Sequence, residues 1–188
     1  MLSDVVPDGL ALLPDHFRAR LQVTQQCRAE DIEPVRARYA ELGIPAELAT
    51  YLPDLPDRLA WAHLVIARAG ASTIAELTVA GRPAILIPLP SATDDHQTAN
   101  AREMAKAGGA RAIAQSRFTA RELAKQMQKL ALDPGALANA AERARSVGRP
   151  DAASALADLV ERTGRTRGEE LVGAADSRHA TLPQGAYA

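Results

Sequence analysis

Residues 64–77 read LVIARAGASTIAEL, and this stretch decides the fold. Its apolar beginning, 64–67, predicts a short buried strand, and Ala69-Gly70-Ala71 predicts a glycine-centred turn. A helical pattern then opens at Thr73. In such a unit the first free backbone N–H groups and the positive end of the helix dipole point at one spot. The stretch therefore predicts an α/β unit with an anion site at its turn.

The same alternation of strand and helix runs through most of the chain. Candidate strands lie at 21–25, 46–52, 64–67, 84–89 and 110–114. Candidate helices lie at 3–14, 30–42, 57–62, 73–79, 97–107, 119–131, 134–145 and 151–162. This order predicts a doubly wound parallel sheet with right-handed crossovers, in which ligands bind at the carboxyl ends of the strands. We expect one domain over 1–162 and a disordered tail over 163–188, where Gly, Arg, Ser and Pro replace the periodic pattern.

Bulk composition narrows the class of protein. The 188 residues are 47% hydrophobic but only 3% aromatic, which suits Ala, Leu, Val and Ile helices packed on a parallel sheet. The formal net charge of −1 gives no reason to expect nucleic acid as a partner. A single cysteine, Cys27, fits a reducing compartment. With no signal-peptide layout at the N-terminus and no apolar run near the roughly 20 residues of a membrane span, we expect a soluble, cytoplasmic protein.

The turn and the helix after it carry two candidate binding features. The N–H groups of Ala71, Ser72 and Thr73 are expected to be free, and they suit a phosphate or diphosphate without any lysine. Glu76 follows Thr73 by three residues, which is the spacing of a capping box. Alternatively, its carboxylate accepts both hydroxyls of a ribose diol one turn from the phosphate.

The loop after the fourth strand holds a second polar group, Asp94-Asp95-His96-Gln97. Two carboxylates and a histidine are compatible with metal ligation or acid–base chemistry. Composition alone favours the simpler interpretation, in which Asp94 or Asp95 caps the next helix and His96 lies on its first turn. Gln97 and Asn100 share a helix face, and their amides suit sugar hydroxyls better than metals.

Three stretches, at 68–77, 80–90 and 94–101, together closely resemble the MurG family, which belongs to glycosyltransferase family 28 and has the GT-B fold. Members of that family transfer N-acetylglucosamine from UDP-GlcNAc to lipid I, giving lipid II for peptidoglycan. The resemblance runs from about residue 3 to about residue 160 and covers the C-terminal, donor-binding half. It implies one Rossmann-like half of a GT-B fold, with neither a metal nor a cofactor.

The resemblance also implies roles for individual residues. It places residues 71–73 against the donor diphosphate, Glu76 on the uridine ribose, and the backbone of Leu52 at the uracil. Gln97, with His96 beside it, faces the GlcNAc hydroxyls, and Asn100 supports this loop or lies near the sugar. The full set implied in UDP-GlcNAc binding is Leu52, Gly70, Ala71, Ser72, Thr73, Ile74, Glu76, His96, Gln97 and Asn100.

The chain also departs from the family. The family's donor half opens with a strand and a Gly-Gly-Ser-Gln-Gly-Ala loop before the helix that begins here near Ser3, and its acceptor domain carries the general base and the membrane-facing surface. Neither is found here, so we expect the chain to hold no catalytic residue and to be inactive alone, with lipid I bound through the missing acceptor domain. The alternatives are a non-catalytic remnant that binds a nucleotide sugar, or the donor subunit of a two-chain enzyme with a separate acceptor subunit. Full-length members are peripheral on the cytoplasmic face of the membrane.

Overall fold

The computed structural model describes residues 1–92, 95–131 and 133–176. The chain divides into two compact units, of which the first spans Met1–Gly148 and the second begins at Arg149. Each unit is described by itself.

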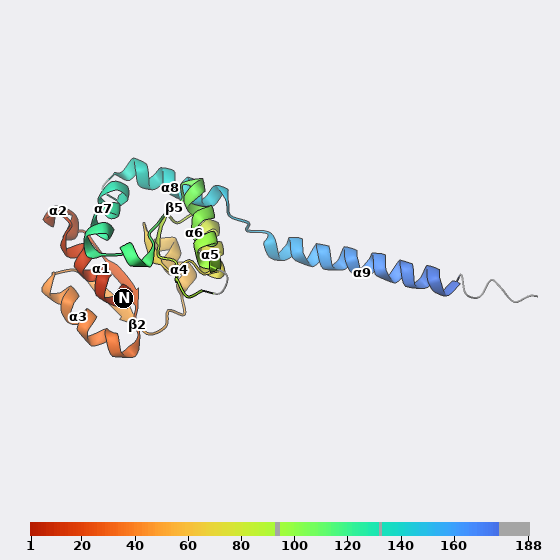
Figure 1. Ribbon diagram of the computed structural model, residues 1–188, viewed down its shortest axis with the longest axis horizontal. Helices are drawn as coiled ribbons and strands as arrows, with labels where there is room; N and C mark the ends of the chain where they lie inside the picture. The colour runs from red at the N-terminus through yellow and green to blue at the C-terminus, as the bar shows by residue number, and fades with distance from the viewer. Residues whose placement is uncertain (93–94, 132, 177–188) are drawn as a thin grey trace, which may run out of the picture. The chain divides into compact units, whose positions relative to one another are not determined.

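The first unit alternates strands and helices in the predicted order (Figure 1). Its elements are α1 (Leu2–Ala11), α2 (Asp15–Arg18), β1 (Val23–Gln26), η1 (Ala29–Asp31), α3 (Ile32–Glu41), β2 (Ala46–Ala49), α4 (Leu55–Trp61), β3 (Val65–Ala67), α5 (Ala71–Ala80), β4 (Ala84–Leu86), α6 (His96–Ala107), β5 (Ala110–Ala112), η3 (Gln115–Arg117), α7 (Ala120–Ala131) and α8 (Pro134–Ser146). Every predicted strand and helix of this unit is confirmed, with strands shorter than predicted. The one-turn helix α2 was not predicted, since four residues show no periodicity.

All strand pairs are parallel, as predicted, but the strands form two ladders instead of one sheet. β1 pairs with β2, so that Val23 lies opposite Ala46, while the second ladder has the order β3-β4-β5. In a doubly wound sheet the strand order is 3-2-1-4-5-6. Here β2 and β1 correspond to strands 3 and 2, and β3, β4 and β5 correspond to strands 4, 5 and 6. The break between β1 and β3 is therefore at the position of strand 1. Within the described residues, β1 and β3 therefore each keep one edge without a strand partner.

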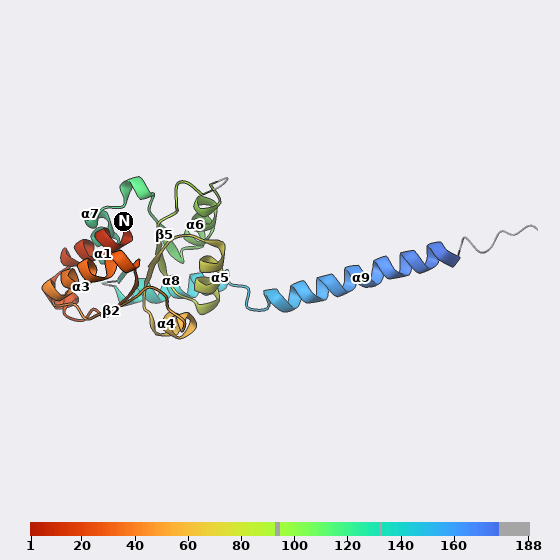
Figure 2. The ribbon, with the colours of Figure 1, turned by 90° about the horizontal axis from the view of Figure 1, so that it is seen from below.

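The central strand β4 decides how the helices are layered. Side chains alternate between the two faces of a strand, so Ile85 and Ile87 point to one side and Ala84 and Leu86 to the other. The isoleucines join a core cluster with α1, α3 and α7, whereas Ala84 and Leu86 join a cluster with α5, α6 and α8. All four are fully buried, which explains the continuous apolar run in the sequence. Figure 2 shows α1, α3 and α7 on one side of the β5 region and α5 and α6 on the other.

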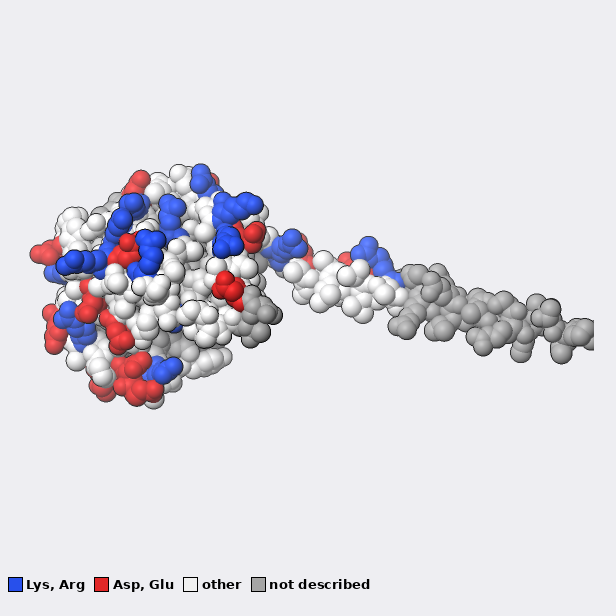
Figure 3. All heavy atoms as spheres, viewed as in Figure 1, with Lys and Arg blue, Asp and Glu red and all other residues white. Residues whose placement is uncertain are grey.

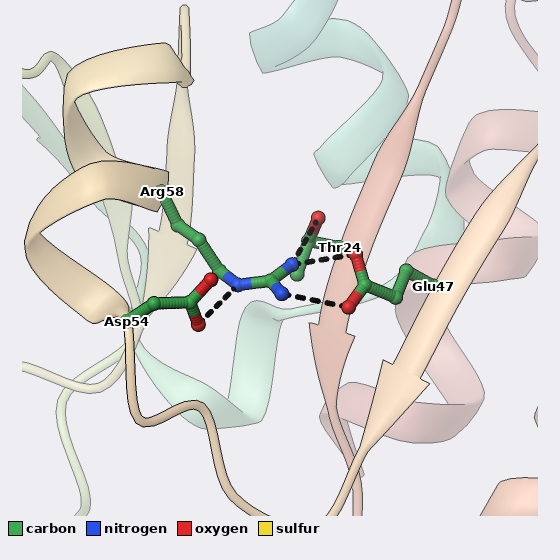
Figure 4. A network of polar contacts seen from close by, with 4 residues as sticks. All are labelled: Thr24, Glu47, Asp54 and Arg58. Carbon is green, nitrogen blue, oxygen red and sulfur yellow. Dashed lines mark hydrogen bonds and ion pairs between the residues drawn. The ribbon is translucent and has the colours of Figure 1, made fainter.

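An ion-pair network connects α4 with the β1–β2 ladder (Figure 4). The Arg58 guanidinium on α4 donates to both carboxylate oxygens of Glu47 on β2, at 2.6 and 2.7 Å, and to Asp54 at 2.7 Å. It also donates to the Thr24 hydroxyl on β1 at 3.3 Å. These hydrogen bonds lower the pKa of the Glu47 and Asp54 carboxyl groups and raise the pKa of Arg58.

The second unit contains helix α9, Ala152–Asp176. Helix α9 continues past Arg162, where the sequence predicted regular structure to end. Residues 163–176 contain no proline, and their Glu, Leu and Ala residues favour helix. The predicted disorder of 177–188 falls outside the described residues. Leu156, Leu159 and Val160 are exposed on α9. Among the described residues no helix combines the length and apolar character of a membrane span.

Candidate functional site

The candidate anion site lies where β3 passes into α5. The helix begins at Ala71, two residues before the predicted start, with Gly70 at the N-cap position. Its first helical hydrogen bond runs from the Ile74 N–H to the Gly70 carbonyl at 3.0 Å. Across the described part of the chain, the N–H groups of residues 71–73 have no hydrogen-bond acceptor. The predicted free donors at a helix N-terminus are therefore confirmed.

Space is left open beside Gly70. Its backbone has an ordinary extended conformation, with φ −62° and ψ 150°, which any residue adopts. A Cβ atom built there would meet only the Thr73 Oγ1 within 4 Å, at 3.6 Å. By contrast, a Cβ atom on Gly109 would lie 2.7 Å from the Ala144 Cα. The fold itself thus requires glycine at 109 but not at 70, where the open space lies next to the free N–H groups.

Further along α5, Glu76 faces solvent whereas Ile74 packs on the core. Glu76 is exposed, and its carboxylate has no hydrogen bond to any described residue. The capping-box alternative does not form, because Thr73 is the third residue of the helix instead of its cap. Ile74 packs its side chain on the second core cluster, and its N–H is already bonded, so it supports the helix.

Helix α6 holds the turn through two amide side chains. The Gln97 Oε1 accepts the Ala69 N–H at 3.2 Å and the Leu89 N–H at 3.0 Å, while the Asn100 amide donates to the Ala69 carbonyl at 3.1 Å. Both backbone groups of Ala69 are therefore paired by α6. Of the two roles proposed for Asn100, support of the loop is the one that the structure contains. The Gln97 carbonyl is already used, which leaves its NH₂ group for other contacts.

Arg68 makes a further connection that sequence reasoning missed. Its Nη1 donates to the carbonyls of Ile87 and Pro88, at 3.2 and 3.4 Å. Pro88 and Pro90 have no N–H, so these two residues of the loop after β4 donate no backbone hydrogen bond. The sequence shows an arginine at position 68 but does not indicate that its side chain contacts the end of β4.

The other predicted residues lie outside this turn. Leu52 is half-buried in the β2–α4 loop, and none of the described hydrogen bonds connects that loop with residues 69–73. His96 is the exposed first residue of α6, and Asp95 occupies the N-cap position with φ 53° and no side-chain cap. Asp94 lies outside the described residues. The described part of the chain contains no cluster of three or more His, Cys, Asp or Glu side chains suited to a metal.

A hollow of about 380 Å³ lies at the ends of β4 and β5, and no residue of the turn lines it. Its walls come from the ends of β4 and β5 and from α6, namely Pro88, Pro90, Asp95, Thr98, Arg102, Ala105, Ala112, Ala114 and Gln115. The Gln115 Oε1 is buried and accepts no hydrogen bond from the described residues.

Comparison with known proteins identifies the family. Residues 1–161 match the Glycosyltransferase family 28 C-terminal domain. The chain belongs to this family. Both the free N–H groups of α5 and the amide contacts of α6 lie within the matched residues.

Relatives of this glycosyltransferase family 28 chain are close in sequence. It is 70% identical over 164 residues to a protein of Zymomonas mobilis and 66% identical to one of Novosphingobium aromaticivorans. Both are named UDP-N-acetylglucosamine--N-acetylmuramyl-(pentapeptide) pyrophosphoryl-undecaprenol N-acetylglucosamine transferase. The match covers 87% of this chain but 42% of each relative, so the chain spans less than half of their length.

Solved structures agree on the fold. The crystal structure of Acinetobacter baumannii MurG superimposes with a TM-score of 0.78 at 32% identity, over 86% of this chain and 48% of that one. A kitacinnamycin glycotransferase matches with a TM-score of 0.59 at 27% identity. The parallel strands and covering helices of the first unit are thus a GT-B-type, Rossmann-like arrangement.

Proposed function

We propose that this chain binds UDP-GlcNAc as the donor-binding part of a MurG-type N-acetylglucosamine transferase. The observation that carries the proposal is the start of α5, where three unpaired N–H groups lie beside the open face of Gly70. A diphosphate satisfies such donors and interacts favourably with the helix dipole. The names of the close relatives supply the nucleotide sugar.

Each part of the donor then has a partner on this chain. The diphosphate lies on the N–H groups of residues 71–73, and the exposed Glu76 carboxylate accepts the two ribose hydroxyls. The Leu52 backbone lies at the uracil, and the Gln97 NH₂ group, with His96 beside it, reaches the sugar. Gly70 leaves room for the diphosphate, and Ile74 and Asn100 hold the surrounding backbone in place.

The transfer itself needs groups that we assign to the remainder of the longer relatives. Inverting transfer requires a base that deprotonates the acceptor hydroxyl as it attacks the anomeric carbon. The donor part contributes the N–H groups that stabilise the leaving diphosphate. In this proposal lipid I binds to an acceptor part, in the same polypeptide or a separate one, at the cytoplasmic face of the membrane.

Glu76 provides the test of the nucleotide assignment. Calorimetric titration of the full chain is expected to give tighter binding of UDP than of 2′-deoxy-UDP, by roughly tenfold for one lost charge-assisted hydrogen bond. Glu76→Ala loses both hydrogen bonds, so it should lower UDP affinity at least to that of the deoxy nucleotide and remove the difference between the two nucleotides. Glu103→Ala, which removes an exposed carboxylate on α6, should leave both affinities unchanged. Equal affinity of the intact chain for both nucleotides and for pyrophosphate would contradict the assignment.

A further inference from the structure

Arg68 differs from the paired arginines of this chain in what surrounds its charge. Arg18, Arg36, Arg38 and Arg58 all form ion pairs with carboxylates. Arg68 is half-buried and donates only to the neutral carbonyls of Ile87 and Pro88, and none of the described carboxylates lies within ion-pair distance. Within the described residues, no negative charge therefore neutralises its guanidinium.

Burial makes this arrangement costly. Desolvation lowers the pKa of the Arg68 guanidinium, although an arginine stays protonated in proteins. A partly buried charge without a counter-ion is unfavourable, and such groups are usually paired. Carbonyl acceptors satisfy N–H donors but supply no compensating negative charge. The missing negative charge is what a bound anion would provide.

The position of Arg68 indicates which anion that is. Arg68 directly follows β3 and stands three residues before Ala71, the first of the three unpaired N–H groups. Its side chain reaches the end of β4, so its guanidinium lies at the same sheet edge as the turn. Figure 3 shows basic and acidic side chains interspersed over the visible face of the first unit, so attraction of an anion depends on local charges such as this one.

We propose that Arg68 is a further donor-binding residue, whose unneutralised guanidinium stabilises the diphosphate of the nucleotide sugar. The inference rests on the proposed function and adds to it a cationic group, the Arg68 guanidinium. The carbonyls of Ile87 and Pro88 hold the guanidinium at the strand ends before the ligand arrives. The N–H groups of α5 provide directed hydrogen bonds, and Arg68 provides the charge.

Substitutions separate this electrostatic role from a structural one. Arg68→Lys keeps the charge and loses the planar fork, whereas Arg68→Met keeps most of the length and loses the charge. Arg82→Met is the matched control, because Arg82 also donates to a backbone carbonyl, that of Ala60 at 2.8 Å, but stands before β4 at the opposite end of the sheet.

The experiment is calorimetric titration of each full-length variant with UDP, uridine and pyrophosphate. Arg68→Met should weaken UDP and pyrophosphate binding by roughly 10- to 100-fold and leave uridine binding unchanged. Arg68→Lys should retain most of the UDP affinity, and Arg82→Met all of it. UDP affinity of the intact chain should also fall with added salt more steeply than that of Arg68→Met.

Four outcomes would overturn the inference or separate it from the proposed function. An equal loss of UDP and uridine binding in both Arg68 variants would mean a merely structural role, and an unchanged UDP-to-uridine ratio in Arg68→Met would also overturn it. If pyrophosphate binding depends on Arg68 but UDP binds no more tightly than pyrophosphate, the role of Arg68 is supported and the nucleotide assignment is contradicted. If neither ligand binds the folded intact chain, both fail.

Discussion

The Gln97 side chain and the Ala69 backbone are joined by a hydrogen bond of 3.2 Å, which fixes the start of the α5 turn to helix α6. The same Gln97 oxygen also accepts the N–H of Leu89 at 3.0 Å. One amide carbonyl therefore holds the ends of two neighbouring strands, β3 and β4, at the edge where the donor is proposed to bind. Asn100 completes the connection through the Ala69 carbonyl.

The two hydrogen bonds that the Gln97 carbonyl accepts predict that its removal lowers the stability of the fold. Gln97→Leu leaves the N–H groups of Ala69 and Leu89 without an acceptor, and Ala69 is fully buried. A buried donor left unsatisfied costs about 1–3 kcal/mol, so urea denaturation should show a loss of at least that size. Gln97→Glu keeps an acceptor oxygen and should recover most of the stability. An equal loss in both variants would mean that the acceptor oxygen is not what matters.

The Arg58 network predicts acid sensitivity. The pKa values of Glu47 and Asp54 are lower in the folded chain than in ordinary carboxyl groups, because both accept hydrogen bonds from Arg58. Their contribution is fully present above the unfolded carboxyl pKa near 4 and is lost as the pH falls through the lower folded values. Arg58→Met should therefore show a smaller fall in Tm between about pH 6 and pH 3 than the intact chain. Arg36→Met, which removes an exposed pair with Glu33 on one helix, should keep the full fall.

The stability of the fold should be sensitive to an added methyl group at Gly109 but not at Gly70. Gly109→Ala places a Cβ atom 2.7 Å from the Ala144 Cα, against backbone that cannot yield easily, and should lose about 1–3 kcal/mol. Gly70→Ala meets nothing closer than 3.6 Å and should change the unfolding free energy by less than about 1 kcal/mol. Thermal and urea unfolding of both variants check this contrast. A larger loss at Gly70 than at Gly109 would show that the turn has no free space.

The open edges of β1 and β3 predict that a further parallel strand stabilises the unit. The side chains of Val23 and Ile66 on these strands are only partly buried, unlike those of β4. The N–H groups of Val23 and Val65 donate to the segments of β2 and β4, respectively. Because the N–H groups of successive strand residues point to opposite edges, the N–H groups of Thr24 and Ile66 point to the open edges. Lengthening the chain at its N-terminus with sequence from the Zymomonas mobilis relative should raise Tm and slow hydrogen exchange at Thr24 and Ile66. Unchanged exchange at both amides would count against a strand between β1 and β3.

The sequence predicted the elements and their order well, and the contacts between distant loops poorly. Apolar runs such as 84–89 and stop signals such as Gly81 and Gly108 act locally, so they are readable without coordinates. The break between the two ladders depends on which strands are neighbours, and periodicity does not contain that information. The α5 start was misplaced because Thr73 and Glu76 imitate a capping box while Gly70 provides the cap position.

In the candidate site too, local features could be predicted from the sequence, whereas contacts between distant residues could not. The free N–H groups followed from the strand–glycine–helix pattern, and Gln97 and Asn100 were singled out by their shared helix face. Their hydrogen bonds to Ala69, and the reach of Arg68 to Ile87, arise only when β3 and β4 lie side by side. Polar side chains that bind distant backbone groups have no sequence signal of their own.

Titration of the folded chain with UDP-GlcNAc, compared between the intact protein and Gly70→Ser, tests the central claim most directly. Serine is a good N-cap residue, so its hydroxyl can bond to the free N–H groups of α5 while its side chain occupies the space beside them. We predict saturable binding to the intact chain, a loss of roughly tenfold or more in Gly70→Ser, and unchanged or higher Tm in that variant. Equal UDP-GlcNAc affinity in the two folded proteins, or no binding to either, would contradict a donor site at this turn.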